Sequence, residues 1–113
     1  KPHHNGGLPL SYRYTITARF TSSTVAEEWV EWLLNGHCEA VVRAGALRAE
    51  IVAMDTPPLA FDVRYDFIDR AAFENYERTH APALRDEGIA LFPPSRGIEY
   101  ARTMGSLRQI IER

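Results

Sequence analysis

The sequence has very little of three features that often reveal function. Its one cysteine, Cys38, excludes an intrachain disulfide framework and a cysteine-rich zinc site. Its only lysine is Lys1, so the expected folded part has no lysine for Schiff-base chemistry. No apolar run approaches the roughly 18 residues that a membrane span needs, and we expect no contact with a membrane.

Neither sign of charge dominates the chain. Thirteen basic and 15 acidic residues leave a formal net charge of −2, which argues against a general nucleic-acid binder. A glycine-rich phosphate loop and a serine nucleophile elbow are also missing from the sequence. Residues 1–11 contain proline and glycine but no apolar core of a secretory signal. We therefore expect a flexible N-terminal arm and a cytoplasmic protein.

The 113 residues suffice for one domain, and three segments alternate between apolar and polar residues. This alternation is typical of strands with one buried face. The segments span residues 12–20, 46–54 and 59–68, and a weaker fourth strand is expected over 97–104. Because only a short turn with Pro57 and Pro58 separates the second and third segments, they should form an antiparallel hairpin.

The first segment with helical spacing spans residues 24–44. Thr24 and Glu27 match a capping box at its start. Gly36 interrupts it, since glycine costs about 1 kcal/mol relative to alanine inside a helix, so we expect one kinked helix or two short ones. The stripe that should cover the sheet consists of Val25, Trp29, Trp32 and Leu33. At least one of the two tryptophans should be buried.

The second segment with helical spacing begins at Asp69, a residue type that caps helices. Pro82 is expected to break this helix and Gly88 to end it. Its inward stripe should consist of Phe73, Tyr76, His80 and Leu84. The ring of His80 should therefore point toward the sheet.

The order β-α-β-β-α-β predicts an α+β domain over residues 12–104, followed by a tail over 105–113. The ferredoxin-like fold satisfies this order with a four-stranded antiparallel sheet and two helices on one face. The opposite face should carry Arg13, Arg19, Arg48, Glu50, Asp62, Arg64, Asp66 and Glu99. Cross-strand Arg–Asp pairs are expected there. Because an open sheet face and edge are rarely left unprotected, we predict a homodimer with a mixed polar interface.

Four segments carry a more specific pattern. They are Tyr14–Thr17, Glu31–Leu33 followed by His37, Val63–Tyr65, and Tyr76–Gly88 with its Tyr, His-Ala, Leu-Arg and Gly. Through them the chain resembles, over about residues 12–104, a small bacterial family known only as a domain of unknown function. The resemblance implies a ferredoxin-like domain of the dimeric α+β barrel type. It implies no known activity.

Four residues are candidate ligand-binding groups: His37, Tyr65, His80 and Arg85. Two helix breaks should bring side chains and free backbone groups together, which favours a binding site there. Arg85 is suited to clamp an anion, and the Tyr65 hydroxyl needs a partner if it is buried. The alternative interpretation is a hydrogen-bond network that only satisfies the two breaks.

Two function classes follow from these features. The first is a homodimeric module that binds a small molecule or a protein, without catalysis, cofactor or metal. The second is a small dimeric barrel enzyme, similar to a monooxygenase or a heme-handling protein, in which His80 is the central group. Nucleic-acid binding on the open sheet face is disfavoured, because that face lacks the exposed aromatic residues that stack on bases.

Overall fold

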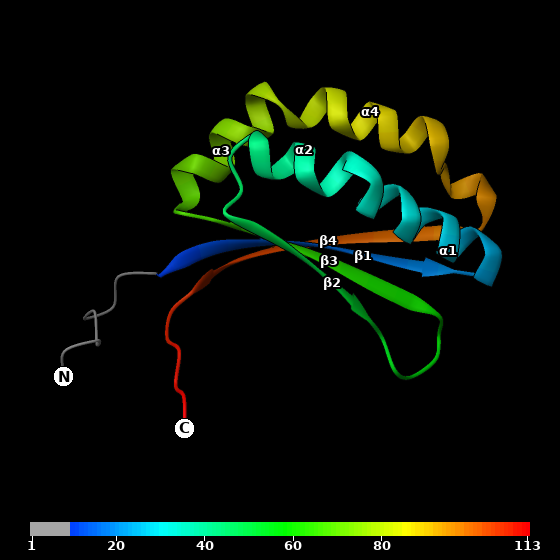
Figure 1. Ribbon diagram of the computed structural model, residues 1–113, viewed down its shortest axis with the longest axis horizontal. Coiled ribbons are helices and arrows are strands. Elements are labelled where there is room, and N and C mark those ends of the chain that lie inside the picture. Colours follow the sequence, from blue (N-terminus) through cyan, green and yellow to red (C-terminus); the bar gives the residue numbers. More distant parts are fainter. Residues whose placement is uncertain (1–9) are drawn as a thin grey trace.

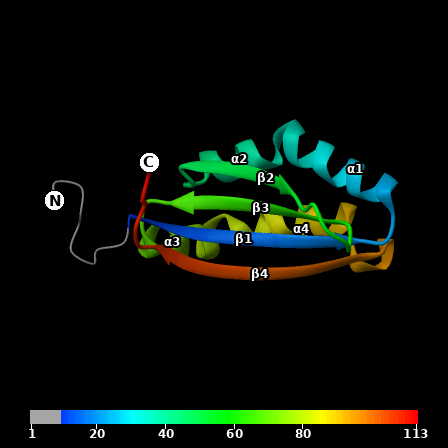
Figure 2. The same ribbon diagram turned by 90° about the horizontal axis from the view of Figure 1, so that it is seen from below.

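The alternating segments form one antiparallel sheet in the computed structural model, which describes residues 10–113. The strands are β1 (Ser11–Phe20), β2 (Arg48–Ala53), β3 (Ala60–Phe67) and β4 (Ile98–Leu107). They lie in the order β2-β3-β1-β4 (Figure 2), as the ferredoxin-like fold requires. The expected fold class and the β2–β3 hairpin are confirmed. The first nine residues of the expected arm lie outside the described residues.

The last strand is longer than expected. It continues past residue 104 to Leu107, because β1 offers a backbone partner along its whole length. Ser11 pairs with Leu107 at one end of this ladder, and Phe20 pairs with Ile98 at the other. Residues 105–107 therefore belong to the sheet rather than to the C-terminal tail.

Helices cover one face of the sheet and leave the other face open (Figure 1). The first helical arm runs through α1 (Ser23–Trp32), a π-helical turn η1 (Leu33–His37) and α2 (Cys38–Arg43). The second arm contains α3 (Arg70–Thr79) and α4 (Ala81–Leu91), and a short 3₁₀ turn η2 (Pro94–Arg96) leads into β4. Each sequence segment with helical spacing thus forms a broken helix.

Both helix breaks occur where the sequence indicates them. Asn35 and Gly36 have non-helical dihedral angles, with φ of 133° at Gly36, a region that favours glycine. In the second arm His80 has φ of −120° between the two helices. Pro82 then lies in the first turn of α4, where its missing N–H costs no helical hydrogen bond.

Two of the expected helix ends are wrong. Ser22, not Thr24, caps α1: it has extended backbone angles and its Oγ accepts from the Val25 N–H at 3.2 Å. Thr24 is already inside the first turn. Gly88 does not end α4, which continues to Leu91. Asp69 caps α3 as expected, since its Oδ1 accepts from the Ala72 N–H at 2.8 Å.

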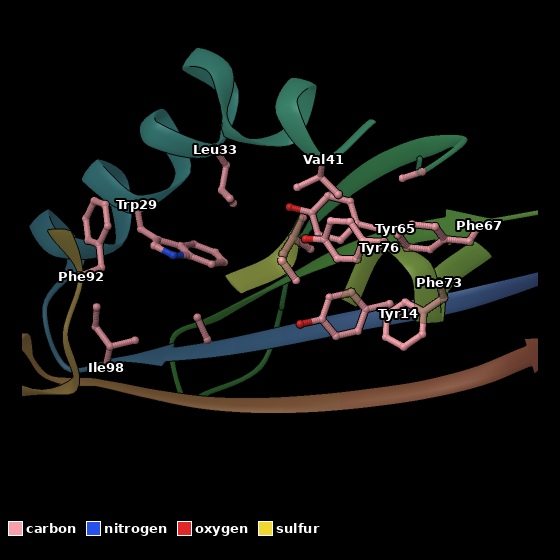
Figure 3. Packing of buried hydrophobic residues seen from close by; sticks show 14 of the residues in the cluster. Tyr14, Trp29, Leu33, Val41, Tyr65, Phe67, Phe73, Tyr76, Phe92 and Ile98 are labelled. Atoms are coloured by element: carbon pink, nitrogen blue, oxygen red, sulfur yellow. The ribbon is translucent and has the colours of Figure 1, made fainter. Parts of the chain in front are cut away.

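The core is rich in aromatic rings and lies between the helices and the sheet (Figure 3). The ring of Phe67 on β3 lies 5.4 Å from Phe73 and 5.2 Å from Tyr76 of α3. Trp29 is only 3% exposed and its ring lies 5.5 Å from Phe20. The prediction that one of the tryptophans is buried is confirmed by Trp29.

The open sheet face carries the expected ion pairs. Arg13 on β1 and Arg48 on β2 both contact Asp66 on β3, at 2.8 Å and 3.0 Å. Both pairs join residues that are direct neighbours in the ladder. The hydrogen bond from Arg13 is the main reason why the pKa of Asp66 is lowered. Because Arg48 is half exposed, each pair adds little stability, but together they fix the polar character of this face.

Candidate functional site

A pocket of about 200 Å³ lies between the two helical arms and the sheet. Trp29 and Trp32 of α1 form one side, and Leu84 and Gly88 of α4 form the other. The floor is made by β1, β3 and β4 through Tyr14, Ile16, Val63, Tyr65, Tyr100 and Arg102. The wall is mostly apolar and aromatic, as in typical small-molecule sites.

Three tyrosine hydroxyls converge on this space. Figure 3 shows the hydroxyl ends of Tyr14, Tyr65 and Tyr76 pointing to the side on which Trp29 and Leu33 lie. Burial is the main reason why the pKa values of Tyr65 and Tyr76 are raised above their usual range. Both phenols therefore keep their protons at neutral pH and remain hydrogen-bond donors.

An arginine cluster closes one end of the pocket. Arg102 lies on the helix side of β4, because it pairs with the inward residue Ile16. Its Nε donates to the Tyr14 hydroxyl at 3.0 Å, and its guanidinium lies 5.1 Å from the Tyr14 ring centroid. Arg85 comes from α4, and the Nη2 atoms of both arginines donate to Glu77 at 3.0–3.2 Å. We call these four residues, Tyr14, Glu77, Arg85 and Arg102, the arginine cluster.

His37 contributes a second polar group to the pocket. The π-helical turn carries its ring onto the indole of Trp32, with 4.0 Å between ring centroids and 22° between the planes. Its Nδ1 is buried and has no hydrogen-bond partner among residues 10–113. Burial lowers the pKa of His37 to about 4, so the ring is neutral at pH 7 and suited to hydrogen bonding rather than to charge pairing.

Cys38 follows directly and contacts the floor of the pocket. Its Sγ lies 3.6 Å from the Tyr65 hydroxyl. Burial is the main reason why the pKa of this thiol is raised, so it stays protonated at neutral pH. A protonated thiol is a weak nucleophile, and the contact supplies the partner that the buried Tyr65 hydroxyl needs.

Three of the four sequence-predicted site residues line the same pocket: His37, Tyr65 and Arg85. His80 does not. It is exposed, because the backbone leaves helical geometry at this residue. The expectation that its ring points toward the sheet is therefore wrong, and the inward stripe passes from Tyr76 through the buried Ala81 to Leu84 of the next helix. Whether the other three bind a ligand stays a prediction.

Of the arginine cluster, only Arg85 is among the residues predicted from the sequence. Arg102 carried a usable signal, since it alternates with Ile98 and Tyr100, which both face the helices. Glu77 carried none, because it is a polar residue on the side of a helix whose inward stripe is elsewhere. Its role depends on how α3 and α4 sit relative to β4, which is a tertiary property.

Gly88 also belongs to the site, because the indole of Trp32 lies close to its Cα. A Cβ at this position would lie 3.1 Å from Cη2 of Trp32, closer than most side-chain contacts. The missing side chain lets the indole lie against α4, between this helix and His37. Gly88 thus shapes the pocket wall instead of ending the helix.

Neither a metal site nor a membrane-spanning helix is found in the described residues. Within 10–113, no group of three or more histidine, cysteine or acidic side chains is placed to hold a metal ion. In the same residues, no helix is long and apolar enough to cross a membrane.

Solved structures share this fold at low sequence identity. A dimeric ferredoxin-like protein from an uncultured marine organism is similar with a TM-score of 0.70 and 14% identity, over 92% of this chain and 100% of its own. A monooxygenase from the gene ActVA-Orf6 of Streptomyces coelicolor, solved with Nanaomycin D, gives 0.71 and 18%, over 92% and 93%. SnoaB, a cofactor-independent oxygenase from Streptomyces nogalater, gives 0.65 and 12%, over 91% and 98%. At these identities the likeness concerns the fold.

The sequence itself matches one family model. Residues 11–104 match the model described as "Domain of unknown function (DUF4286)". No curated protein matches the chain. The match covers all four strands up to Met104, and it includes the pocket-lining residues from Tyr14 to Arg102.

Proposed function

The chain belongs to the DUF4286 family, a domain of unknown function, and we propose that it binds a small, mostly apolar molecule in the pocket between helices and sheet. The observation that carries this proposal is the composition of the pocket wall. Both tryptophans of the chain and four of its five tyrosines line one pocket. Such a concentration of aromatic rings around an open space is characteristic of ligand sites rather than of a filled core.

The size of the pocket limits the ligand. Its volume of about 200 Å³ is below the roughly 300–1,000 Å³ of sites for drug-sized molecules. A compact molecule of one or two fused rings suits it best. The aromatic side chains that line the pocket, Trp29 and Trp32 among them, favour an aromatic ring, since offset aromatic pairs add about 0.5–1.5 kcal/mol beyond the burial of their area.

The enzymatic alternative loses the residue on which it was based. His80 is exposed and does not line the pocket, so it has no path to a molecule bound there. Two of the similar folds are described as oxygenases, but at 12–18% identity this supports fold and not reaction. We therefore favour binding without catalysis.

A direct test uses 2-naphthol, a neutral fluorescent two-ring probe. Its fluorescence anisotropy should rise saturably when the protein is added. Leu84→Phe enlarges a wall residue and should weaken binding about tenfold or more, since one methylene in such a pocket is worth about 10–200-fold. Leu91→Phe is the matched control on the same helix: it is 48% exposed and outside the pocket. Equal, non-saturable binding by all three proteins would contradict the proposal.

We also propose that the protein acts as a homodimer that packs through the open sheet face. The chain has the fold of a protein described as dimeric, and its open face carries paired charges from three strands. Arginines and carboxylates of both signs suit a self-complementary polar interface with a second copy. Its cytoplasmic location remains a prediction.

A further inference from the structure

We propose that the pocket selects a ligand that carries an anionic group, preferably a carboxylate. Arg85 and Arg102 bind this group, and the Glu77 carboxylate competes with it for the two arginines. This inference rests on the proposed ligand binding and names its chemical class. It is based on the arginine cluster, in which two cations from different elements meet at one end of an aromatic pocket.

The geometry places both guanidinium groups at the pocket. Arg85 reaches it from α4 and Arg102 from β4, and both line the cavity. Their side chains are 42% and 41% exposed, so they stand at its mouth rather than in its depth. A ligand whose ring lies among the aromatic side chains of the pocket would then have its substituent at the arginines.

The charges favour an anion. The two arginines share one carboxylate, Glu77, which leaves one positive charge in the cluster. None of the described residues that line the pocket is acidic. An anionic group on the ligand would therefore meet uncompensated positive charge, whereas a cationic group would meet repulsion.

Within the part of the chain that the structure describes, the cluster retains unused hydrogen-bond donors. Arg102 uses Nε for Tyr14 and Nη2 for Glu77, which leaves the two N–H groups of Nη1 for another acceptor. The oxygen of Tyr14 accepts from Arg102, so its own proton remains to be donated. Donors on a planar guanidinium match the two oxygens of a carboxylate better than a single neutral acceptor.

Glu77 holds this arrangement in place and also limits its affinity for anions. Both of its carboxylate oxygens accept from Arg85, and Oε2 accepts from Arg102 as well. The side chain therefore occupies the same type of donor that a ligand carboxylate would use. Removing its charge while keeping an acceptor should strengthen anion binding without affecting neutral ligands.

The first experiment compares two probes of nearly equal shape, 2-naphthoate and 2-naphthamide, by calorimetric titration of the unaltered protein at low and moderate salt. We expect naphthoate to bind about tenfold more tightly than naphthamide, with a preference that shrinks as salt rises. Equal affinities would overturn the selectivity and leave the proposed pocket intact. Failure of both probes to bind would contradict the proposed function itself.

Variants then assign the preference to the cluster. Arg102→Gln should abolish the preference for naphthoate and keep naphthamide binding. Arg96→Gln is a matched control, because Arg96 also lies over an aromatic ring, Phe92 at 5.2 Å, and also pairs with a glutamate, but outside the pocket. It should bind like the parent. A preference that survives Arg102→Gln would overturn the assignment.

Glu77→Gln should change the affinity for naphthoate in the opposite direction, which a loss of structure cannot explain. We expect naphthoate to bind several-fold more tightly to this variant than to the parent, while naphthamide affinity stays the same. A misfolded variant would lose both affinities and could not produce a gain. Unchanged or weaker naphthoate binding in a variant that still binds naphthamide would show that Glu77 does not compete.

Discussion

At the scale of single residues, His37 illustrates how a site residue differs from a core residue. A histidine in the core normally finds a hydrogen-bond partner for each buried ring nitrogen. His37 stacks on Trp32 but leaves Nδ1 without one. Its burial without compensation lowers its pKa to about 4, and this has a measurable consequence for stability.

Acid should destabilise the protein through His37. In the unfolded chain the ring has its ordinary pKa of 6.5, whereas in the folded protein the value is about 4. Between these values the unfolded chain binds more protons, so the free energy of unfolding falls as the pH decreases from about 7 and levels off near 4. The contribution is about 2 kcal/mol between pH 7.5 and 5.

Urea unfolding at several pH values measures this effect. His37→Gln should lose about 2 kcal/mol less than the parent over that interval, while His80→Gln, at an exposed position, should follow the parent. Parallel pH curves for the parent and His37→Gln would contradict the assignment.

Truncation of Trp29 should remove a large part of the packing between α1 and the sheet. It is 3% exposed and packs on Phe20, so Trp29→Ala should lower the free energy of unfolding by about 3–5 kcal/mol. Leu34→Ala on the same helical arm is the control, since Leu34 is 69% exposed and should change stability by about 0.5 kcal/mol or less. If the two variants have the same denaturant midpoint, the packing described for α1 is refuted.

At the scale of elements, the two helix breaks have different causes, and the sequence predicts their consequences unequally well. The break in the first arm depends on Gly36, whose positive φ is a local property that the residue type reveals. Pro82 predicts the break in the second arm, but it does not predict that the His80 side chain is exposed. His80 is itself the non-helical residue, so helical periodicity assigned this residue to the wrong side, whereas Leu84 beyond the break does line the pocket.

Gly36 should be sensitive to alanine through its backbone alone. A Cβ would meet nothing within 4 Å, but φ is 133°, so Gly36→Ala should destabilise by about 1–3 kcal/mol from strain. Gly105→Ala is the matched control, because that position is equally open and lacks a positive φ. Thermal unfolding that shows equal stability for the two variants would contradict this explanation.

The limits of sequence reasoning follow the same division. Alternation placed β1, β2 and β3 and their open face, because period two is a local property with a direct structural meaning. The capping signals were wrong at two helix ends. Ser22 takes the role expected of Thr24, and Gly88 makes room for Trp32 instead of ending α4. The pocket was predicted through His37, Tyr65 and Arg85, but Glu77 enters it only through the packing of α3 against α4 and β4.

At the scale of the whole molecule, the two sheet faces have opposite characters. The covered face holds the aromatic core and the pocket, and the open face holds a network of arginines and carboxylates. We therefore assign a ligand to the covered face and a second copy of the chain to the open face. Neither role requires the other, so they are tested separately.

Light scattering at micromolar concentration tests whether the protein forms a homodimer. The expected mass is twice the 12.8 kDa of the single chain. Arg13→Glu places a second carboxylate beside Asp66 and should shift the equilibrium toward the monomer, since Arg13 and Asp66 pair on the open face. A parent mass near that of one chain would refute the homodimer.

The central claim is that the pocket between helices and sheet takes up a small molecule, and amide chemical-shift mapping with 2-naphthol tests it most directly. We expect saturable shifts at residues that surround the pocket, among them Leu33, His37, Leu84 and Gly88. Residues of the open face, such as Arg64 and Asp62, should stay unchanged. Shifts confined to the open face, or none at millimolar probe, would contradict it.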